Sequence, residues 1–508
     1  MNANFKLLLC TLACSLLVAC GGKHDDDRGQ TQAERAGIGA VSAHAGATPF
    51  IAQLSYALRN FNQVERIDYR IAPRPGAHSQ AAVVTMEHGW LARRAAWNPA
   101  GANAGSIAFP VFGLYANHRN ELTVTTTFRD GSKHVAQVAL PTGPFSGPAA
   151  LYGQPEIRRA RGAASPGFDY MLIRNGITSP VVVDTDGQLR WVGVGLGDSF
   201  SSLFGLDAFY VGDAASPLLH RMDVDGSFRS SVLSDSRYSN FHHELAQGKN
   251  GFLAQFDVRE NNLLRLESTI AEIDTGGRVL KEWDLSRIFR DTMRAGGDDP
   301  SNFVRDGIDW FHSNSAIYDR QDNAILVSSR ENFVVKLDYD SGAIRWILGD
   351  PAKHWYVNYP SLRALALRVT EGNVPVGQHA LSVLANRELL LFNNGLASLN
   401  QPAGAPRGMN RTFSTPSRYA IDEQSRTARE VWSWEGEREL YSDICSSTYE
   451  AAPNRYLVAY SVLAERTQAR LIALNSAGAV AFDFAYPSTV CDTVFLARPF
   501  ALNALTLR

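Results

Sequence analysis

The stretch Val183-Asp184-Thr185-Asp186-Gly187-Gln188-Leu189-Arg190-Trp191 decides the fold. An apolar strand ends at Asp184, a turn follows at Gly187, and a second strand leads to an aromatic residue. Aspartate side chains bond to the backbone of turns, and glycine supplies the positive φ that tight turns need. The stretch is therefore predicted to form a β-hairpin, which alone is a weak signal for any particular fold.

The same pattern returns five more times along the chain. The copies occupy residues 222–228, 273–283, 337–346, 421–432 and 474–482. The intervals are irregular, from 39 residues (Asp184 to Asp223) to 84 residues (Asp338 to Asp422). Six copies of one hairpin in series predict six blades of a β-propeller with loops of variable length, which we assign to residues 149–508.

Histidines recur in the segments that precede the later blades' strands. These segments are Phe241-His242-His243-Glu244-Leu245, Trp310-Phe311-His312-Ser313-Asn314-Ser315 and Gly377-Gln378-His379-Ala380-Leu381. Aligned by the strand that follows, His243, His312 and His379 occupy one position in three successive blades. Equivalent positions on innermost strands converge at a propeller axis, so the three imidazoles are predicted to meet. Buried polar rings need partners, and convergent polar groups mark a site rather than packing.

Two further polar residues belong to this predicted site. Arg330 ends the otherwise apolar strand 324–330, where it is either a rim charge or a cation aimed at the histidines. Beside three histidines, an anion suits its planar fork of donors. Asn314 is two residues from His312, so in a strand it points to the same face, although asparagine at a strand start often only caps backbone.

The chain before the repeats predicts a smaller unit. Residues 48–140 read as short alternating strands, for example 122–128 and 134–138 joined through Asp130-Gly131. We expect a small N-terminal β-sandwich there. The Pro- and Gly-rich stretch 141–148 is the expected linker, so the fold class is all-β, a small β-sandwich followed by a six-bladed propeller.

The first residues predict export. Lys6 precedes an apolar run over residues 7–18, which is too short to span a bilayer. The run ends at Leu17-Val18-Ala19-Cys20, which resembles a lipobox, although an ordinary secretory signal with an incidental cysteine remains the alternative. Residues 1–19 are then the signal peptide, and 20–47 a lipidated Cys20 with a disordered polar tether. Glycine after Cys20, by resemblance to sorting rules, favours the outer membrane.

Charge and cysteine content narrow the function classes. The formal net charge is −2, and basic and acidic residues are evenly mixed along the sequence. The sequence therefore shows no basic cluster of the kind that binds nucleic acid. Of five cysteines, only Cys445 and Cys491 lie outside residues 1–20. An even pair in an oxidising compartment predicts a disulfide, with two unpaired buried thiols as the alternative.

The histidine segments, with Val327-Ser328-Ser329-Arg330 and Phe392-Asn393-Asn394-Gly395, resemble the bacterial arylsulfate sulfotransferases. Pro110-Val111-Phe112-Gly113-Leu114-Tyr115 in the N-terminal unit is similar too. The resemblance implies a six-bladed propeller with an N-terminal β-sandwich, acting in the periplasm without a nucleotide sulfate donor. It implies that His379 is transiently sulfated. It also implies that the sulfate group is held by His312, Arg330, Asn314 and one of His242 and His243.

The sequence therefore predicts ping-pong transfer of a sulfuryl group from a phenolic sulfate ester to a phenol. No cofactor and no metal are expected, and the membrane is expected as a partner through the lipid anchor. Two alternatives stay open. Three histidines are a set of ligands for zinc or iron, although Arg330 would be repelled by the ion. Propellers also serve as non-catalytic binding proteins, here as a binding lipoprotein.

Overall fold

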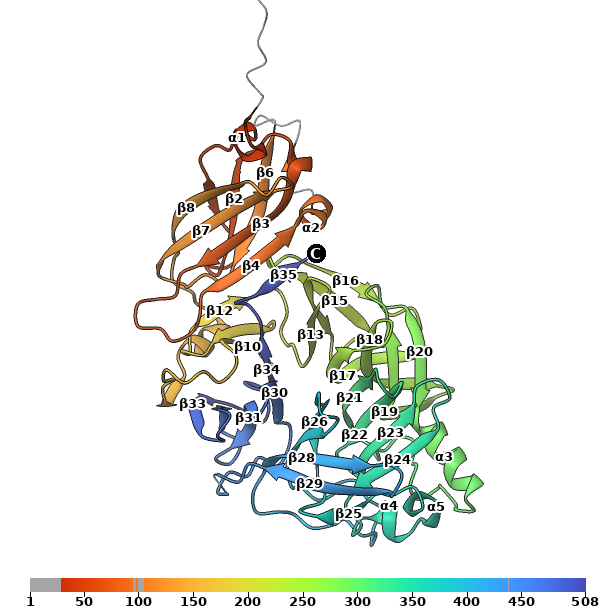
Figure 1. The fold of residues 1–508 in the computed structure, drawn as a ribbon. Coiled ribbons are helices and arrows are strands. Elements are labelled where there is room, and N and C mark those ends of the chain that lie inside the picture. Colours follow the sequence, from red (N-terminus) through yellow and green to blue (C-terminus); the bar gives the residue numbers. More distant parts are fainter. Residues whose placement is uncertain (1–28, 95–96, 99–104, 437) are drawn as a thin grey trace, which may run out of the picture.

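The computed structural model describes residues 29–94, 97–98, 105–436 and 438–508, which are mainly β-structure with a few short helices (Figure 1). The expected signal peptide and Cys20 lie outside these residues. Within the described ranges, no helix combines the length and apolar character needed to cross a membrane. The α-helices are α1 (Gln32–Arg35), α2 (His88–Arg93), α3 (Leu285–Ala295), α4 (His354–Val357) and α5 (Pro360–Arg363).

Six sheets follow one another along most of the chain. The first is β12 (Leu189–Val192), β11 (Val181–Asp184), β10 (Tyr170–Arg174) and β34 (Leu496–Phe500). The second is β13 (Ser201–Gly205), β14 (Ala208–Gly212), β15 (Leu218–Asp223) and β16 (Phe228–Val232). The third is β17 (Tyr238–Gln247), β18 (Phe252–Glu260), β19 (Leu263–Ile273) and β20 (Val279–Asp284).

The remaining three of the six have the same antiparallel order, two of them with an extra edge strand. The fourth is β21 (Ser313–Asp319), β22 (Ala324–Ser329), β23 (Phe333–Asp338) and β24 (Ile344–Gly349). The fifth is β26 (His379–Val383), β27 (Leu389–Asn393), β28 (Thr415–Asp422), β29 (Thr427–Ser433) and β25 (Arg368–Glu371). The sixth is β30 (Ser447–Ala452), β31 (Arg455–Leu463), β32 (Gln468–Leu474), β33 (Val480–Pro487) and β9 (Glu156–Arg159).

Each repeated hairpin joins two neighbouring strands in a different one of these sheets. The turn chemistry is that expected from the sequence. Asp184 Oδ1 accepts the backbone N–H groups of Asp186 at 3.1 Å and Gln188 at 2.9 Å, and Gly187 has a φ of 82°. In the fifth copy, which lacks the glycine, Arg426 takes the positive φ, 52°.

In three of the six hairpins the tryptophan bonds to the sheet that follows. Trp191 Nε1 donates to the Val224 carbonyl oxygen at 2.9 Å, in the turn of the second hairpin. Trp283 Nε1 donates to the Tyr339 carbonyl oxygen at 3.2 Å, and Trp346 Nε1 to a Glu423 carboxylate oxygen at 2.9 Å. Each acceptor is the residue directly after the hairpin aspartate of the following sheet. The aromatic residue therefore fastens one sheet to the next.

The first strands of the sheets lie next to one another in sequence order. Strand β13 contacts β17, β17 contacts β21, β21 contacts β26, β26 contacts β30, and β30 contacts β34. Strand β34 comes from the end of the chain, yet it pairs with β10 in the first sheet, with Tyr170 opposite Phe500. The first sheet is thus completed by the last part of the sequence.

The N-terminal unit contains two sheets that share one hydrophobic core. The first is β1 (Ser42–Ala45), β2 (Ile51–Ala57), β6 (Ser106–Phe112) and β5 (Trp97–Asn98). The second is β35 (Leu505–Leu507), β4 (Ala82–Glu87), β3 (Val64–Ile71), β7 (Arg119–Phe128) and β8 (Lys133–Pro141). Strand β35 is parallel to β4 and lies beside it in Figure 1. The assignment of residues up to 508 to the propeller is therefore corrected, because the last strand belongs to the N-terminal unit.

The prediction of a disordered tether is wrong for residues 29–47, the part of it that the structure describes. Helix α1 begins after Thr31, whose side chain and that of Glu34 form a reciprocal capping box. Strand β1 pairs with β2, with Ser42 opposite Ser55. All four side chains of β1 are exposed, so the strand is held by its backbone pairing with β2, which its short Ser-Ala-His-Ala sequence does not predict.

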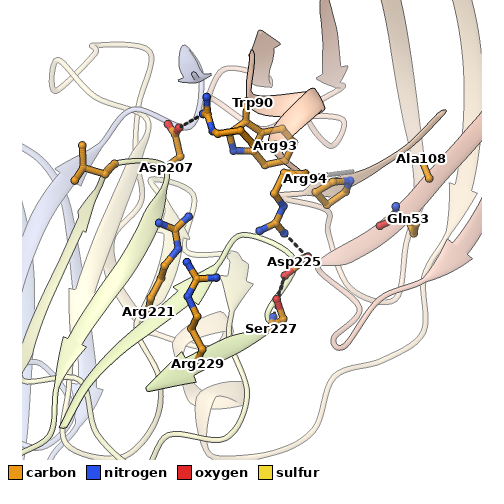
Figure 2. Close-up of a pocket in the computed structure, with 12 residues that line it drawn as sticks. Gln53, Trp90, Arg93, Arg94, Ala108, Asp207, Arg221, Asp225, Ser227 and Arg229 are labelled. Carbon is orange, nitrogen blue, oxygen red and sulfur yellow. Dashed lines mark hydrogen bonds and ion pairs between the residues drawn. The ribbon is translucent and has the colours of Figure 1, made fainter. Parts of the chain in front are cut away.

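The N-terminal unit contacts the second sheet across a cavity of about 600 Å³ (Figure 2). Arg94 follows α2 and binds Asp223 at 2.7 Å and Asp225 at 2.5 Å. Arg221 projects into the same cavity and is paired with Asp223 at 2.9 Å. Most of the cavity's positive charge is therefore compensated by carboxylates, and none of the predicted site residues lines it.

Candidate active site

The structure brings together the three histidines that the sequence aligned. His243 lies within β17, His312 directly precedes β21, and His379 begins β26. The ring centroid of His243 is 4.8 Å from that of His312 and 5.8 Å from that of His379. Because β17, β21 and β26 are neighbouring first strands, each sheet contributes one imidazole to the cluster.

The backbone is irregular at each of these positions. His243, His312 and Ala380 have positive φ angles of 49°, 52° and 55°. The strand register is interrupted at the same places in all three sheets. Bulges of this kind re-aim a side chain, and left-handed backbone is strained for a residue such as alanine. The histidines are therefore presented by three similar local distortions.

Two carboxylates that the sequence analysis missed hold His312. Its Nδ1 lies 2.6 Å from Asp309 Oδ2 and 2.8 Å from Glu267 Oε2. The same Glu267 carboxylate lies 3.7 Å from His243 Nδ1 and 3.5 Å from His242 Nδ1. Asp309 lies only three residues before His312 in the sequence. Glu267 belongs to β19 and has no local signal in the sequence.

These surroundings divide the histidines by charge. Burial disfavours a charged His312, but Glu267 and Asp309 outweigh it and raise its pKa to about 9. Burial lowers the pKa of His243 to about 3, in spite of Glu267. Burial, with the positive charges of neighbouring His312 and Arg330, also holds the pKa of His379 well below its ordinary value. At neutral pH the site thus combines a protonated His312 with a neutral His243 and a neutral His379.

Arg330 follows β22 at the edge of the cluster. Its backbone N–H donates to the carbonyl oxygen of His312 at 3.1 Å. Its Nη2 lies 2.9 Å from Glu331 Oε1 and 3.8 Å from Asp309 Oδ2. The guanidinium is therefore fixed beside His312 by Glu331, and 14% of its side chain remains exposed.

Asn314 and His242 have partners of their own. Asn314 is fully buried, and its Nδ2 donates to the carbonyl oxygen of Gln378 at 2.8 Å. Its Oδ1 has no hydrogen-bond partner within the described residues. His242 Nε2 lies 3.0 Å from Asp257 Oδ2, and its ring is 6.2 Å from that of His243. Of the doubled histidines, His243 is thus the one next to His312 and His379.

Two sets of potential metal ligands overlap at Glu267. One is His242, His243 and Glu267, and the other is Glu267, Asp309 and His312. The set of His243, His312 and His379 proposed from the sequence is not among those found in the described residues. His312 Nδ1 lies at hydrogen-bonding distance from both carboxylates, an arrangement that a protonated imidazole explains.

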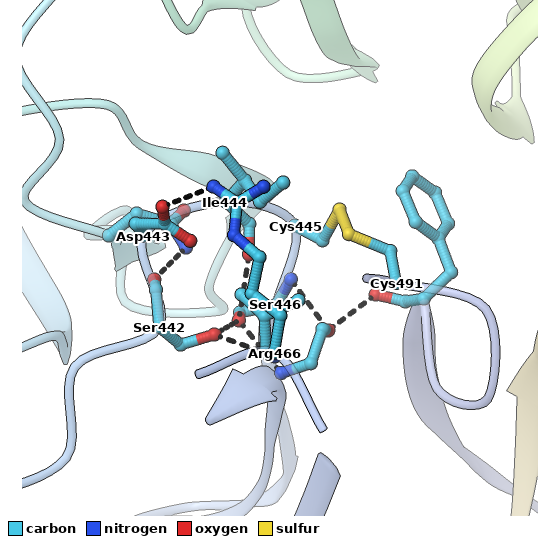
Figure 3. Close-up of a disulfide and its surroundings, with 11 residues drawn as sticks. Ser442, Asp443, Ile444, Cys445, Ser446, Arg466 and Cys491 are labelled. Carbon is cyan, nitrogen blue, oxygen red and sulfur yellow. Dashed lines mark hydrogen bonds and ion pairs between the residues drawn. A yellow bond between two sulfur atoms is a disulfide. The ribbon is translucent and has the colours of Figure 1, made fainter. Parts of the chain in front are cut away.

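An aromatic ring and a disulfide support the cluster from one side. The Phe495 ring centroid is 5.8 Å from those of His243 and His379. Cys445 and Cys491 form a disulfide with a Cα–Cα distance of 6.3 Å (Figure 3). Both cysteines share a hydrophobic cluster with Ala380 and Phe495. Phe495 was missed because it is 116 residues from His379 in sequence (495 − 379).

Comparison with known proteins places this site in a family. The family model described as arylsulfotransferase (ASST) matches residues 163–494, which is more than half of the chain. The chain belongs to the arylsulfotransferase family. This confirms the resemblance found in the motifs, and the matched range contains every histidine of the cluster.

Two curated relatives carry the name arylsulfate sulfotransferase AssT. The protein of Escherichia coli O6:H1 is 26% identical over 337 residues, covering 52% of this chain and 54% of that protein. The protein of Lelliottia amnigena is 28% identical over 228 residues, covering 36% and 37% respectively. The matched region therefore spans about half the length of the first relative and less of the second.

Solved structures resemble the chain only distantly. A europium-containing methanol dehydrogenase aligns with a TM-score of 0.31 and 10% identity, over 74% of this chain and 76% of that one. BamB from Moraxella catarrhalis aligns with a TM-score of 0.28 and 12% identity, over 74% and 96%. Likeness at this level carries no argument about the arylsulfotransferase site.

Proposed function

We propose that this member of the family is an aryl-sulfate sulfotransferase that moves a sulfuryl group from a phenolic sulfate ester to a phenol through a sulfohistidine. The observation that carries the proposal is a neutral His379 beside a protonated His312 and Arg330. A neutral imidazole is a nucleophile near neutral pH, and the two cations suit an anionic sulfuryl group. We also propose that the six sheets are propeller blades and that the two N-terminal sheets form a β-sandwich.

In the first half-reaction, an unprotonated ring nitrogen of His379 attacks sulfur. A nitrogen–sulfur bond forms as the sulfur–oxygen bond to the phenol breaks. His312 gives the proton on its Nε2 to the departing oxygen, and Glu267 and Asp309, which bind Nδ1, keep the ring doubly protonated at neutral pH before that transfer. Arg330 and an N–H donor of His243 stabilise the sulfuryl oxygens. Asn314 would add the second hydrogen of its Nδ2, since the first is donated to the Gln378 carbonyl oxygen.

In the second half-reaction, the acceptor phenol gives its proton to His312 and its oxygen attacks sulfur. The nitrogen–sulfur bond breaks and His379 returns to its neutral state. The choice between His242 and His243 falls on His243, whose ring lies next to those of His312 and His379. His242 is directed to Asp257 instead, which supports a role in holding the neighbouring carboxylates.

The decisive experiment is incubation of the purified protein with 4-nitrophenyl sulfate and phenol. We expect yellow 4-nitrophenolate to appear together with phenyl sulfate, at a rate that depends on phenol. Release of nitrophenolate with free sulfate and no dependence on the acceptor would indicate a sulfatase. No release at all, for a folded protein, would favour a non-catalytic binding protein.

Excess EDTA is expected to leave this activity unchanged. The proposed transfer uses a histidine nucleophile and needs no metal to activate water. The measurement is the initial rate before and after prolonged chelation and gel filtration. Loss of activity on chelation, with recovery in zinc or iron, would instead support the metalloenzyme alternative at the two ligand sets around Glu267.

Substitution of Cys20 by serine is expected to move the protein from the membrane pellet to the soluble periplasm. Serine has no thiol to receive the diacylglyceryl group, so the anchor is lost while the folded body is unchanged. Fractionation and immunoblotting measure the distribution, with the wild-type protein as the reference. A wild-type protein that is already soluble and begins elsewhere than residue 20 would contradict the proposed anchor and its outer-membrane location.

A further inference from the structure

A fully buried carboxylate lies where the first strands meet, one residue after His243. Glu244 Oε2 accepts a hydrogen bond from Ser315 Oγ at 2.6 Å. Its Oε1 is bonded to Arg498, accepts from Tyr449 Oη at 3.3 Å, and lies 3.6 Å from Arg174 Nη1. The partners come from β21, β34, β30 and β10, so the Glu244 side chain on β17 links five strands from four sheets.

Ser315 passes this link to the strand that carries His379. A hydroxyl has one hydrogen to donate, and Ser315 gives it to Glu244. The same Oγ accepts the backbone N–H of Leu381 at 3.0 Å. Glu244 therefore fixes the direction of the Ser315 hydroxyl, and the hydroxyl fixes Leu381, two residues after His379.

The other side of His379 is held from the same sheet. The Gln378 carbonyl oxygen accepts from Asn314 Nδ2 at 2.8 Å and from Ser328 Oγ at 3.1 Å. Between the two anchors, Ala380 has a φ of 55°, which an alanine does not adopt without support. The strained turn that presents His379 is thus clamped at both ends.

We infer that Glu244 and Ser315 are positioning residues that hold the backbone of His379 in the geometry needed for attack on sulfur. This role rests on the proposed function, because it concerns the proposed nucleophile. Neither residue needs to touch the substrate. Misplacement of a reacting group by about 1 Å can cost about 100-fold in rate, so a single missing hydrogen bond here is expected to reach the chemical step.

The test compares Ser315→Ala with Ser447→Ala. Ser447 is the matched control, since it is also a fully buried serine on a first strand whose Oγ accepts a backbone N–H from the adjacent strand, that of Ala497 at 3.1 Å. We expect Ser315→Ala to slow sulfation of His379 roughly 10- to 100-fold, with the KM for the donor nearly unchanged. Ser447→Ala should keep the wild-type rate, although it loses an equivalent hydrogen bond.

Hydrogen–deuterium exchange gives a readout that needs no activity. Ser315→Ala should speed exchange in the peptide covering residues 377–383, and Ser447→Ala in the peptide covering 495–500 only. A wild-type protein without transfer activity would refute the proposed function, while the exchange pattern would still test the clamp. Equal exchange at 377–383 in wild type and Ser315→Ala, or equal rate losses in both variants, would overturn the inference. Glu244→Gln should reproduce the Ser315→Ala effects; if it does not fold, Ser315→Ala alone decides.

Discussion

Replacement of His379 by asparagine is expected to remove covalent sulfation and to lower transfer by several orders of magnitude. The wild-type protein, mixed with an aryl sulfate and no acceptor, should release a burst of phenol no larger than one per active site. The protein should then gain the mass of one sulfuryl group on the peptide that contains His379. The resemblance assigns sulfation to His379, so a variant without its imidazole should show neither burst nor adduct.

Rapid-quench kinetics and peptide mass spectrometry away from acid check this result. His118→Asn is a suitable control, because His118 lies in the N-terminal unit and contacts Tyr115 rather than the cluster. An adduct on His243 or His312 would refute the assignment of the nucleophile while keeping the mechanism. Direct transfer with no adduct on any residue would refute the ping-pong mechanism itself.

Replacement of His312 by asparagine is expected to keep a slow burst but to reduce its rate strongly. The variant loses a charged donor at the reacting centre, a contact worth about 2.7–4 kcal/mol, or about 100- to 1000-fold, by analogy with an oxyanion-hole donor. If His312 is also the acid, the loss should be larger for esters of weakly acidic phenols than for 4-nitrophenyl sulfate. Arg330→Ala should show a loss of similar size without dependence on the leaving group.

The pH profile separates these roles further. The pKa of His312 is raised to about 9, so the protonated form is present below that pH and is lost above it. The wild-type rate with a weakly acidic leaving phenol should therefore fall as pH rises through about 9. Asp309→Asn removes one carboxylate that raises this pKa and should move the fall to lower pH. A profile that is flat up to pH 10 in wild type would contradict an acid role for His312.

Much of the arrangement could be predicted because its signals are local. Each hairpin turn except the fifth is predicted by an aspartate or asparagine and a glycine a few residues apart. Each histidine segment is followed closely by a strand, and that strand gave the alignment of the three histidines. The partners that set the protonation states could not be found in this way. Glu267 reaches His312 from β19, 45 residues earlier in sequence (312 − 267), and only the contact between two sheets brings them together.

The same limit explains the errors at the two ends of the chain. Residues 42–45 are Ser-Ala-His-Ala and all four side chains are exposed, so their composition does not predict the strand β1. Strand β35 is three residues long and pairs with β4, from which it is separated by more than 400 residues. Backbone pairing between strands so far apart produces no periodic pattern in the amino-acid sequence. The contact of Phe495 with the histidines could not be predicted either, because Phe495 is distant from them in sequence.

The completion of the first sheet by β34 has a consequence for how the protein is made. Strands β10, β11 and β12 emerge early in synthesis, but their fourth partner is among the last 13 residues (496–508). Until those residues arrive, β10 carries an open edge, the kind of surface that pairs with other chains. The first sheet is completed only when β34 pairs with β10, so a stop before residue 496 would leave that sheet incomplete. Because the first sheet depends on one late, long-range pairing, we expect folding of this topology to be slow.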